Sequence, residues 1–222
     1  MTPREYKEYL EDVSRYNSKG EKDASIILLE DCTPLEVARA LNFTPQPKND
    51  LEAQAMIFQS RKKSIGEGIE ITVVCPACNN QDFYYIDIDN LFFKEGTNTL
   101  YTDVQIGLIN DIEDLDDKFI NNLSIDDFKD YEEKIILNNK KIFDPKVNLT
   151  CKKCGNVFGT ILDYKGSISK FPIKNIYEQY LDLMTLGNMT KDDVDNMPSF
   201  EREIFIGIIQ EREDKDKNKK QG

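Results

Sequence analysis

The chain contains no histidine among its 222 residues. This absence excludes Ser-His-Asp and Cys-His catalysis, and it removes the side chain that most often acts as a general base near neutral pH. An enzyme with this sequence would depend on carboxylates, lysine or tyrosine, so the absence of histidine makes an enzyme less expected without excluding one. A zinc site in this chain is expected to use cysteine ligands, because histidine is the other common nitrogen or sulfur ligand of zinc.

Long apolar segments are also missing from the sequence. No run approaches the roughly 20 residues that span a bilayer. The N-terminal segment MTPREYKEYLEDV has proline and charges where a signal peptide has an apolar core. We therefore expect a cytosolic protein without a membrane partner.

Positive charge is scarce relative to negative charge. The chain has 29 lysines and arginines against 41 acidic residues, which gives a net charge of -12 and a pI near 4.6. Such a field repels phosphate, so general binding to nucleic acid or anionic lipid is not expected. With 39% hydrophobic and 32% charged residues, the composition is typical of a soluble globular protein of one or two domains.

Four of the five cysteines form two identical Cys-x-x-Cys spacings. They are Cys75 with Cys78 and Cys151 with Cys154. Cys32 is left over, and we expect it to be a free, buried thiol. Two such turns supply the four thiolates of a tetrahedral structural site. We predict one structural zinc ion. A thioredoxin-like redox role is the weaker alternative, because that motif occurs once and opens a helix, whereas both pairs here precede a predicted strand.

Period-two patterns flank both cysteine pairs and predict strands. The predicted strands cover residues 69–73, 83–88, 147–149 and 157–162. A strand, a Cys-x-x-Cys turn (a knuckle) and a second strand make up half of a zinc ribbon, and this order occurs twice in the chain. The 79–150 interval is much longer than a compact ribbon allows, and residues 103–119 and 124–137 have helical patterns. The sequence therefore predicts a zinc ribbon interrupted by a helical insertion.

Helix signals precede the ribbon. Residues 2–5 open a first helix that should end at 18–20, and residues 33–36 form a capping box. Residues 24–30 fit either a strand or a helix. Asp50 is expected to cap a further helix that ends in basic residues, which complement its dipole.

Helices are also predicted after the ribbon. Residues 173–184 carry an apolar stripe, residues 190–193 open a short helix, and Pro198 with Ser199 opens a last one. Apolar residues on these helices are candidates for a partner surface, and we select Tyr177, Tyr180, Phe200, Phe205 and Ile208.

The predicted fold class is α+β, an interrupted zinc ribbon with a helical insertion and flanking N- and C-terminal helices. The expected divisions are an N-terminal helical region at 1–68, the ribbon at 69–168 with its insertion at about 90–145, a C-terminal helical region at 169–210 and a disordered charged tail at 211–222.

Three segments together resemble the baseplate hub assembly proteins of T-even-type contractile-tailed phages. They are Arg61-Lys62-Lys63-Ser64-Ile65-Gly66-Glu67 before the first knuckle, Cys75-Pro76-Ala77-Cys78 with Ile86-Asp87-Ile88 after it, and the Tyr177-x-x-Tyr180-Leu181 helix with Met197-Pro198-Ser199-Phe200-Glu201-Arg202-Glu203. The resemblance covers roughly residues 25–210. It does not account for the long insertion or for the acidic balance.

This resemblance implies a non-enzymatic role in tail morphogenesis. The protein would bind baseplate hub or tail spike components in the host cytoplasm, as a chaperone or as a subunit retained in the virion. A zinc-ribbon nucleic-acid-binding or transcription accessory protein is the alternative, based on Lys152, Lys153 and Lys165 with Phe83, Tyr84 and Tyr85 as stacking surfaces.

Overall fold

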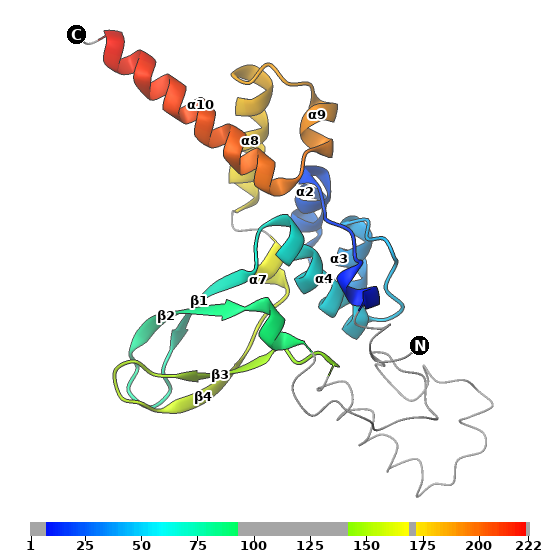
Figure 1. Ribbon diagram of the computed structural model, residues 1–222, viewed down its shortest axis with the longest axis vertical. Helices are drawn as coiled ribbons and strands as arrows, with labels where there is room; N and C mark the ends of the chain where they lie inside the picture. The colour runs from blue at the N-terminus through cyan, green and yellow to red at the C-terminus, as the bar shows by residue number, and fades with distance from the viewer. Residues whose placement is uncertain (1–7, 93–141, 169–171, 221–222) are drawn as a thin grey trace, which may run out of the picture.

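The computed structural model describes residues 8–92, 142–168 and 172–220, and it shows a mixed α and β protein (Figure 1). Helical residues 8–11 come first, followed by three helices, two β-hairpins and four further helices. The three helices before the hairpins are α2 (Ser18–Ile27), α3 (Pro34–Ala40) and α4 (Asp50–Ser64). The hairpins are β1 (Gly68–Val74) with β2 (Gln81–Asp87), followed by the 3-10 turn η1 (Ile88–Leu91), and β3 (Lys146–Thr150) with β4 (Val157–Ile161). The last helices are α7 (Lys165–Ile168), α8 (Ile173–Thr185), α9 (Lys191–Asn196) and α10 (Ser199–Lys220).

Helix α2 corrects the expectation that residues 18–20 end a helix, because they begin one. The side chain of Asn17 accepts a hydrogen bond from the N–H of Gly20 and caps the new helix. Gly20 lies close to α3, where an added Cβ would sit 3.3 Å from the carbonyl oxygen of Leu41. The glycine therefore serves helix packing here, and residues 24–27 are helical.

The helix starts at α3 and α4 follow two different capping patterns. Thr33 and Glu36 form the predicted capping box at α3. At α4 the prediction was wrong by one position, because Asn49 is the cap and accepts from the N–H of Glu52. The carboxylate of Asp50 instead accepts from the N–H of Leu35 and ties α4 to α3.

Both predicted pairs of strands form antiparallel hairpins. Ile69 pairs with Ile86 in the first hairpin, and Leu149 pairs with Phe158 in the second. Each hairpin forms its own two-stranded sheet. The strand faces alternate as predicted, with Ile69, Ile86 and Leu149 buried.

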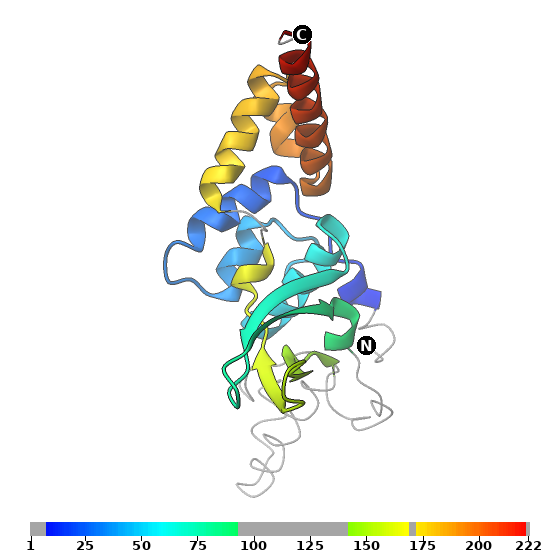
Figure 2. The same ribbon diagram turned by 90° about the vertical axis from the view of Figure 1, so that its left-hand side faces the viewer.

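Two hydrophobic cores are separate in the described structure. The larger core joins the N-terminal helices, the inner faces of the hairpins and α7, and it includes Phe43, Phe58 and Phe143. The smaller core lies among α8, α9 and α10 and includes Ile176 and Leu183. Figure 2 shows these last helices standing beyond α2, away from the hairpins.

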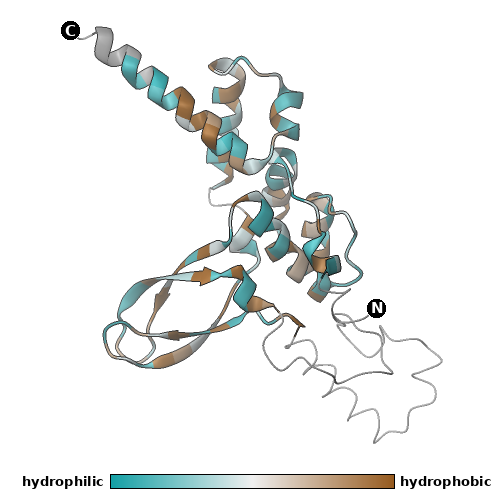
Figure 3. Cartoon of the chain, viewed as in Figure 1, coloured by the Kyte–Doolittle hydropathy of each residue, from teal (hydrophilic) through white to brown (hydrophobic). Residues whose placement is uncertain are grey.

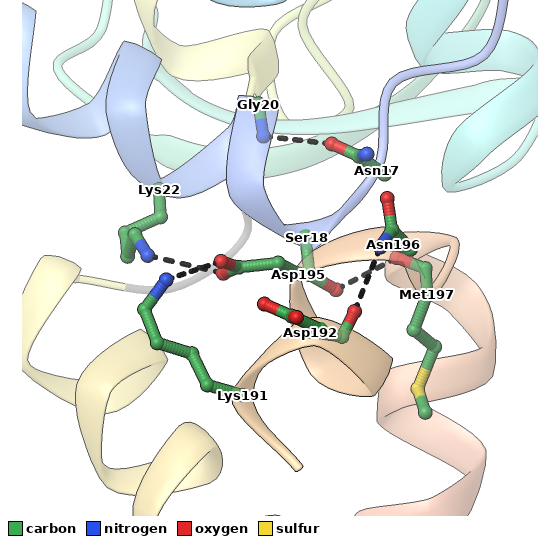
Figure 4. Close-up of polar contacts among 9 residues, drawn as sticks. All are labelled: Asn17, Ser18, Gly20, Lys22, Lys191, Asp192, Asp195, Asn196 and Met197. Atoms are coloured by element: carbon green, nitrogen blue, oxygen red, sulfur yellow. Dashed lines mark hydrogen bonds and ion pairs between the residues drawn. The ribbon is translucent and has the colours of Figure 1, made fainter.

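Polar contacts join the C-terminal helices to α2. Figure 4 shows Lys22 of α2 and Lys191 of α9 both reaching the buried Asp195 carboxylate, at 3.3 and 2.5 Å. Ser18 donates to the carbonyl oxygen of Met197 at 2.9 Å. These contacts fix the position of α9 against the start of α2.

Residues 211–220 correct the expectation of a disordered tail, because α10 continues through Lys220. Glutamate and lysine are good helix formers, and Lys215 lies 4.0 Å from Glu211 one turn away. Figure 3 shows apolar residues in the first half of α10 and hydrophilic ones beyond them. The two predicted insertion helices, at 103–119 and 124–137, and the predicted helix start at 2–5 lie outside the described residues.

Candidate metal centre

The first cysteine pair lies in the turn that joins β1 to β2. The N–H of Cys75 donates to the carbonyl of Asn80, and the N–H of Asn79 donates back to the carbonyl of Cys75, both at 2.9 Å. Asn79 has a φ of 54°, a left-handed conformation that asparagine tolerates better than most residues. This turn directs Cys75 and Cys78 to the same side.

The second cysteine pair repeats this turn between β3 and β4. Cys151 donates to Asn156, and Gly155 donates to Cys151, again at 2.9 Å. Gly155 has a φ of 72° and occupies the place of Asn79, as expected for a glycine after the last cysteine. The two turns therefore have the same backbone hydrogen bonds although their sequences differ.

The four sulfur atoms form one cluster. All four lie within 4.8 Å of one another. Between the two hairpins, Cys75 Sγ lies 3.8 Å from Cys154 Sγ, and Cys78 Sγ lies 3.6 Å from Cys151 Sγ. A tetrahedral zinc ion with Zn–S bonds of about 2.3 Å requires sulfur separations of about 3.8 Å. The cluster fits that geometry, and none of its cysteines is in a disulfide.

The thiols in this cluster have unequal proton affinities. Burial raises the pKa of Cys75, but hydrogen bonds from the N–H groups of Ala77 and Cys78 and from the thiols of Cys151 and Cys154 outweigh burial and bring the pKa to about 7. For Cys78 the N–H of Asn80 lowers the pKa, yet burial and the neighbouring thiols raise it to about 12. A divalent cation at the centre would favour the thiolate at all four positions.

Beside the cysteine cluster, side chains of each hairpin hydrogen-bond to the backbone of the other hairpin. The hydroxyl of Tyr84 donates to the carbonyl of Thr150 at 3.2 Å, and Lys152 Nζ donates to the carbonyl of Phe83 at 2.5 Å. The Tyr84 ring also packs edge-on against Phe158 at 6.5 Å. Lys152 lies 5.2 Å from the centre of the Tyr84 ring, so this lysine is committed to the hairpin contact rather than presented for phosphate binding.

The five residues predicted to bind a partner lie in different environments. Tyr177 is 52% exposed, Ile208 40% and Phe205 38%, while Phe200 is partly buried beneath Arg15. Tyr180 is buried in the smaller core, and Lys22 lies 4.6 Å from the centre of its ring. Burial raises the pKa of the Tyr180 hydroxyl well above its usual value, and the nearby Asp195 carboxylate raises it further.

Sequence reasoning missed other exposed apolar residues beside these. Leu181 and Met184 on α8 and Ile204 on α10 are exposed. The helical stripe of α8 could not show which half would be buried, because both halves have the same spacing. On the hairpins, Val157 and Ile161 are exposed on one face of β4, and the alternation of that strand is the signal for this face.

The fold and the cysteine cluster define a mixed α and β protein whose two hairpins meet at a site suited to a structural metal ion. A family model described as T4 bacteriophage base plate protein matches residues 1–112. The chain belongs to this family of phage baseplate proteins, which confirms the predicted resemblance at the level of the baseplate. No curated protein and no solved structure matches the chain.

The family match extends from the N-terminal helices through the first cysteine pair and η1. The second hairpin and the C-terminal helices lie outside it. Among the described helices, none is long and apolar enough to cross a membrane.

Proposed function

We propose that this protein assembles or chaperones the central hub of a contractile phage tail baseplate through protein–protein contacts, without catalysing a reaction. The observation that carries the proposal is the match of residues 1–112 to the baseplate family. The hub role rests in addition on the resemblance of the segments around the first knuckle and the last two helices. Binding would take place in the host cytoplasm while the tail is built, with hub or spike proteins as partners.

One zinc ion bound by the four cysteines would have a structural role in this function. It would complete an interrupted zinc ribbon and fix the first hairpin, which belongs to the family-matched part, against the second. Four-sulfur zinc sites leave no open position for a substrate or a water molecule. The site therefore supports a scaffold rather than a hydrolytic centre.

The outer face of the C-terminal helices is our candidate for the hub-binding surface. Helix α10 buries Ile206 against α8, yet Ile204, Phe205 and Ile208 are exposed on its other side. Tyr177 and the exposed Leu181 add apolar surface on α8. A helix that packs between its own domain and a partner protein needs apolar residues on both sides, and α10 has them.

Co-expression with the hub and spike proteins of the same phage tests this proposal. Phe205→Ser with Ile208→Ser should abolish co-purification of a hub component while leaving zinc content and helicity unchanged. Ile26→Ser with Leu29→Ser is the matched control, because Ile26 and Leu29 are exposed apolar residues at the end of α2. Normal hub capture by the α10 variant would contradict the assigned surface. Absence of any hub or spike component from the unmodified complex would contradict the function itself.

A further inference from the structure

The sulfur atoms of the cysteine cluster lie close enough to react with one another. Cys75 Sγ in the first turn lies 3.8 Å from Cys154 Sγ in the second, and Cys78 Sγ lies 3.6 Å from Cys151 Sγ. Disulfides form only between cysteines whose side chains point toward one another. Both of these pairs bring a sulfur of one hairpin against a sulfur of the other.

Burial divides the cluster into two protected and two accessible sulfurs. Cys75 and Cys151 are 1% and 2% exposed, whereas Cys154 is exposed and Cys78 is half-buried. An oxidant in solution therefore reaches Cys154 and Cys78 first. Each pair across the hairpins contains one accessible and one protected sulfur, so an oxidised cysteine has an unoxidised partner beside it.

Contacts outside the cluster keep the two hairpins side by side while the sulfurs react. The Tyr84 hydroxyl donates to the carbonyl of Thr150, and Lys152 Nζ donates to the carbonyl of Phe83. The Tyr84 ring also packs against the ring of Phe158. None of these contacts uses a cysteine side chain, so they do not depend on the oxidation state of the sulfurs.

We propose that the cluster is an oxidation-sensitive clip, in which peroxide joins Cys75 to Cys154 and Cys78 to Cys151 by disulfides across the hairpins. The alternative links, within each Cys-x-x-Cys turn, would leave the hairpins without a connection at the cluster. A link across the hairpins also closes a much longer loop of chain than a link inside one turn. A longer closed loop removes more conformational entropy from the unfolded chain, which favours the links across the hairpins.

Each disulfide forms in two balanced steps. The thiolate of Cys154 attacks one oxygen of hydrogen peroxide, the O–O bond breaks, and a sulfenic acid and a hydroxide ion result. The thiolate of Cys75 then attacks the oxidised sulfur, the S–O bond breaks, and a second hydroxide leaves as the S–S bond forms. The pair loses two electrons to the peroxide, and two protons from solvent convert the hydroxides into water. Cys78 and Cys151 react in the same way.

The metal-bound and the disulfide-bonded states suit different surroundings. Reducing compartments keep cysteines as thiols that are available to a metal, and oxidising compartments favour disulfides. A bound zinc ion is released on oxidation, because the thiolate is the form of cysteine that binds metal. Both states join the same two hairpins, so the second hairpin stays against the family-matched first hairpin when the metal leaves. This inference depends on the cluster geometry and not on the hub-binding role.

Disulfide mapping of the full-length, zinc-loaded chain after treatment with hydrogen peroxide tests the proposal. Remaining thiols are blocked, and trypsin then separates Cys151 from Cys154, because two lysines lie between them. We expect the peptide that carries Cys75 and Cys78 to be linked to both peptides of the second hairpin. Fragmentation between Cys75 and Cys78 identifies which cysteine holds which peptide. A chelating dye should detect one zinc ion released per chain, in step with the disulfides.

Circular dichroism and amide exchange of the strands should be unchanged after oxidation, and a thiol reductant with added zinc should restore the starting state. Cys32→Ser is the matched control, because Cys32 lies outside the cluster, and it should leave zinc release and the disulfide pattern unchanged. Links within either turn, links to Cys32 or links between chains would overturn the proposal. So would zinc release without disulfides, or a chain that keeps its zinc and its thiols at a peroxide excess that oxidises a free Cys-Pro-Ala-Cys peptide.

Discussion

The buried ion pair between Arg202 and Glu21 should make the largest single polar contribution to docking of the C-terminal helices. Arg202 on α10 has no exposed side-chain surface, and its NH2 lies 2.7 Å from a carboxylate oxygen of Glu21 on α2, which is 2% exposed. Arg202 Nε also donates to Gln179 of α8 at 2.9 Å. This one side chain therefore joins three helices.

Replacing Arg202 with methionine keeps an unbranched apolar side chain but leaves Glu21 charged and buried. Removal of one partner from a buried pair costs about 3–5 kcal/mol, and loss of the Gln179 hydrogen bond adds about 1 kcal/mol. We expect a total of about 5 kcal/mol, which is a large part of the roughly 5–15 kcal/mol that stabilises a typical domain. With Glu21→Gln added, neither position of the pair carries a charge, and about 2 kcal/mol or more should be recovered.

Urea unfolding of Arg202→Met, Glu21→Gln, the double variant and the unmodified chain completes a double-mutant cycle for this pair. Hydrogen exchange at the first turns of α10 reports whether the loss is local to the docked helices. A cost below about 1 kcal/mol for Arg202→Met, or a double variant no better than the single one, would refute the view that this pair holds the helices together.

Three further outcomes follow from particular contacts. Asn17→Ala should cost about 1 kcal/mol in urea unfolding through loss of the α2 cap, whereas the exposed Lys19→Ala should cost almost nothing. Gly155→Ala should weaken zinc retention against a chelator by about 1–2 kcal/mol because of the left-handed backbone, whereas Asn79→Gly should not weaken it. Burial raises the pKa of Asp195, but hydrogen bonds from Lys191 and Lys22 outweigh burial and lower it. A lowered carboxyl pKa stabilises the fold above the unfolded value, so this contribution should be lost as the pH falls below about 4, and Asp195→Asn should show a flatter acid limb in thermal unfolding.

Local signals in the sequence predicted much of the fold. The paired Cys-x-x-Cys turns, the alternating strands around them and the capping box at Thr33 all depend on residues close together in the chain. Each of these features is present in the structure. Gly155 was predictable for the same reason, since the knuckle itself requires the left-handed backbone there.

The errors occurred where distant residues decide the outcome. Asn17, Ser18 and Gly20 could end one helix or start another, and the start is favoured by packing against Leu41 and by the bond from Ser18 to Met197. Packing against α9 and α10 decides which residues of the α8 apolar stripe are buried. Tyr180 therefore lies in the smaller core, although Tyr177 is exposed. The pairing of Glu21 with Arg202 spans almost the whole chain, and no local pattern indicates it.

Zinc K-edge X-ray absorption on the purified chain, with native mass spectrometry for stoichiometry, tests whether one metal ion joins the two hairpins. We expect one zinc per chain with four sulfur neighbours at about 2.3 Å, and loss of that zinc in Cys151→Ser. A chain that folds without bound metal, or a zinc ion with fewer than four sulfur neighbours, would contradict the claim that one metal ion joins the two hairpins.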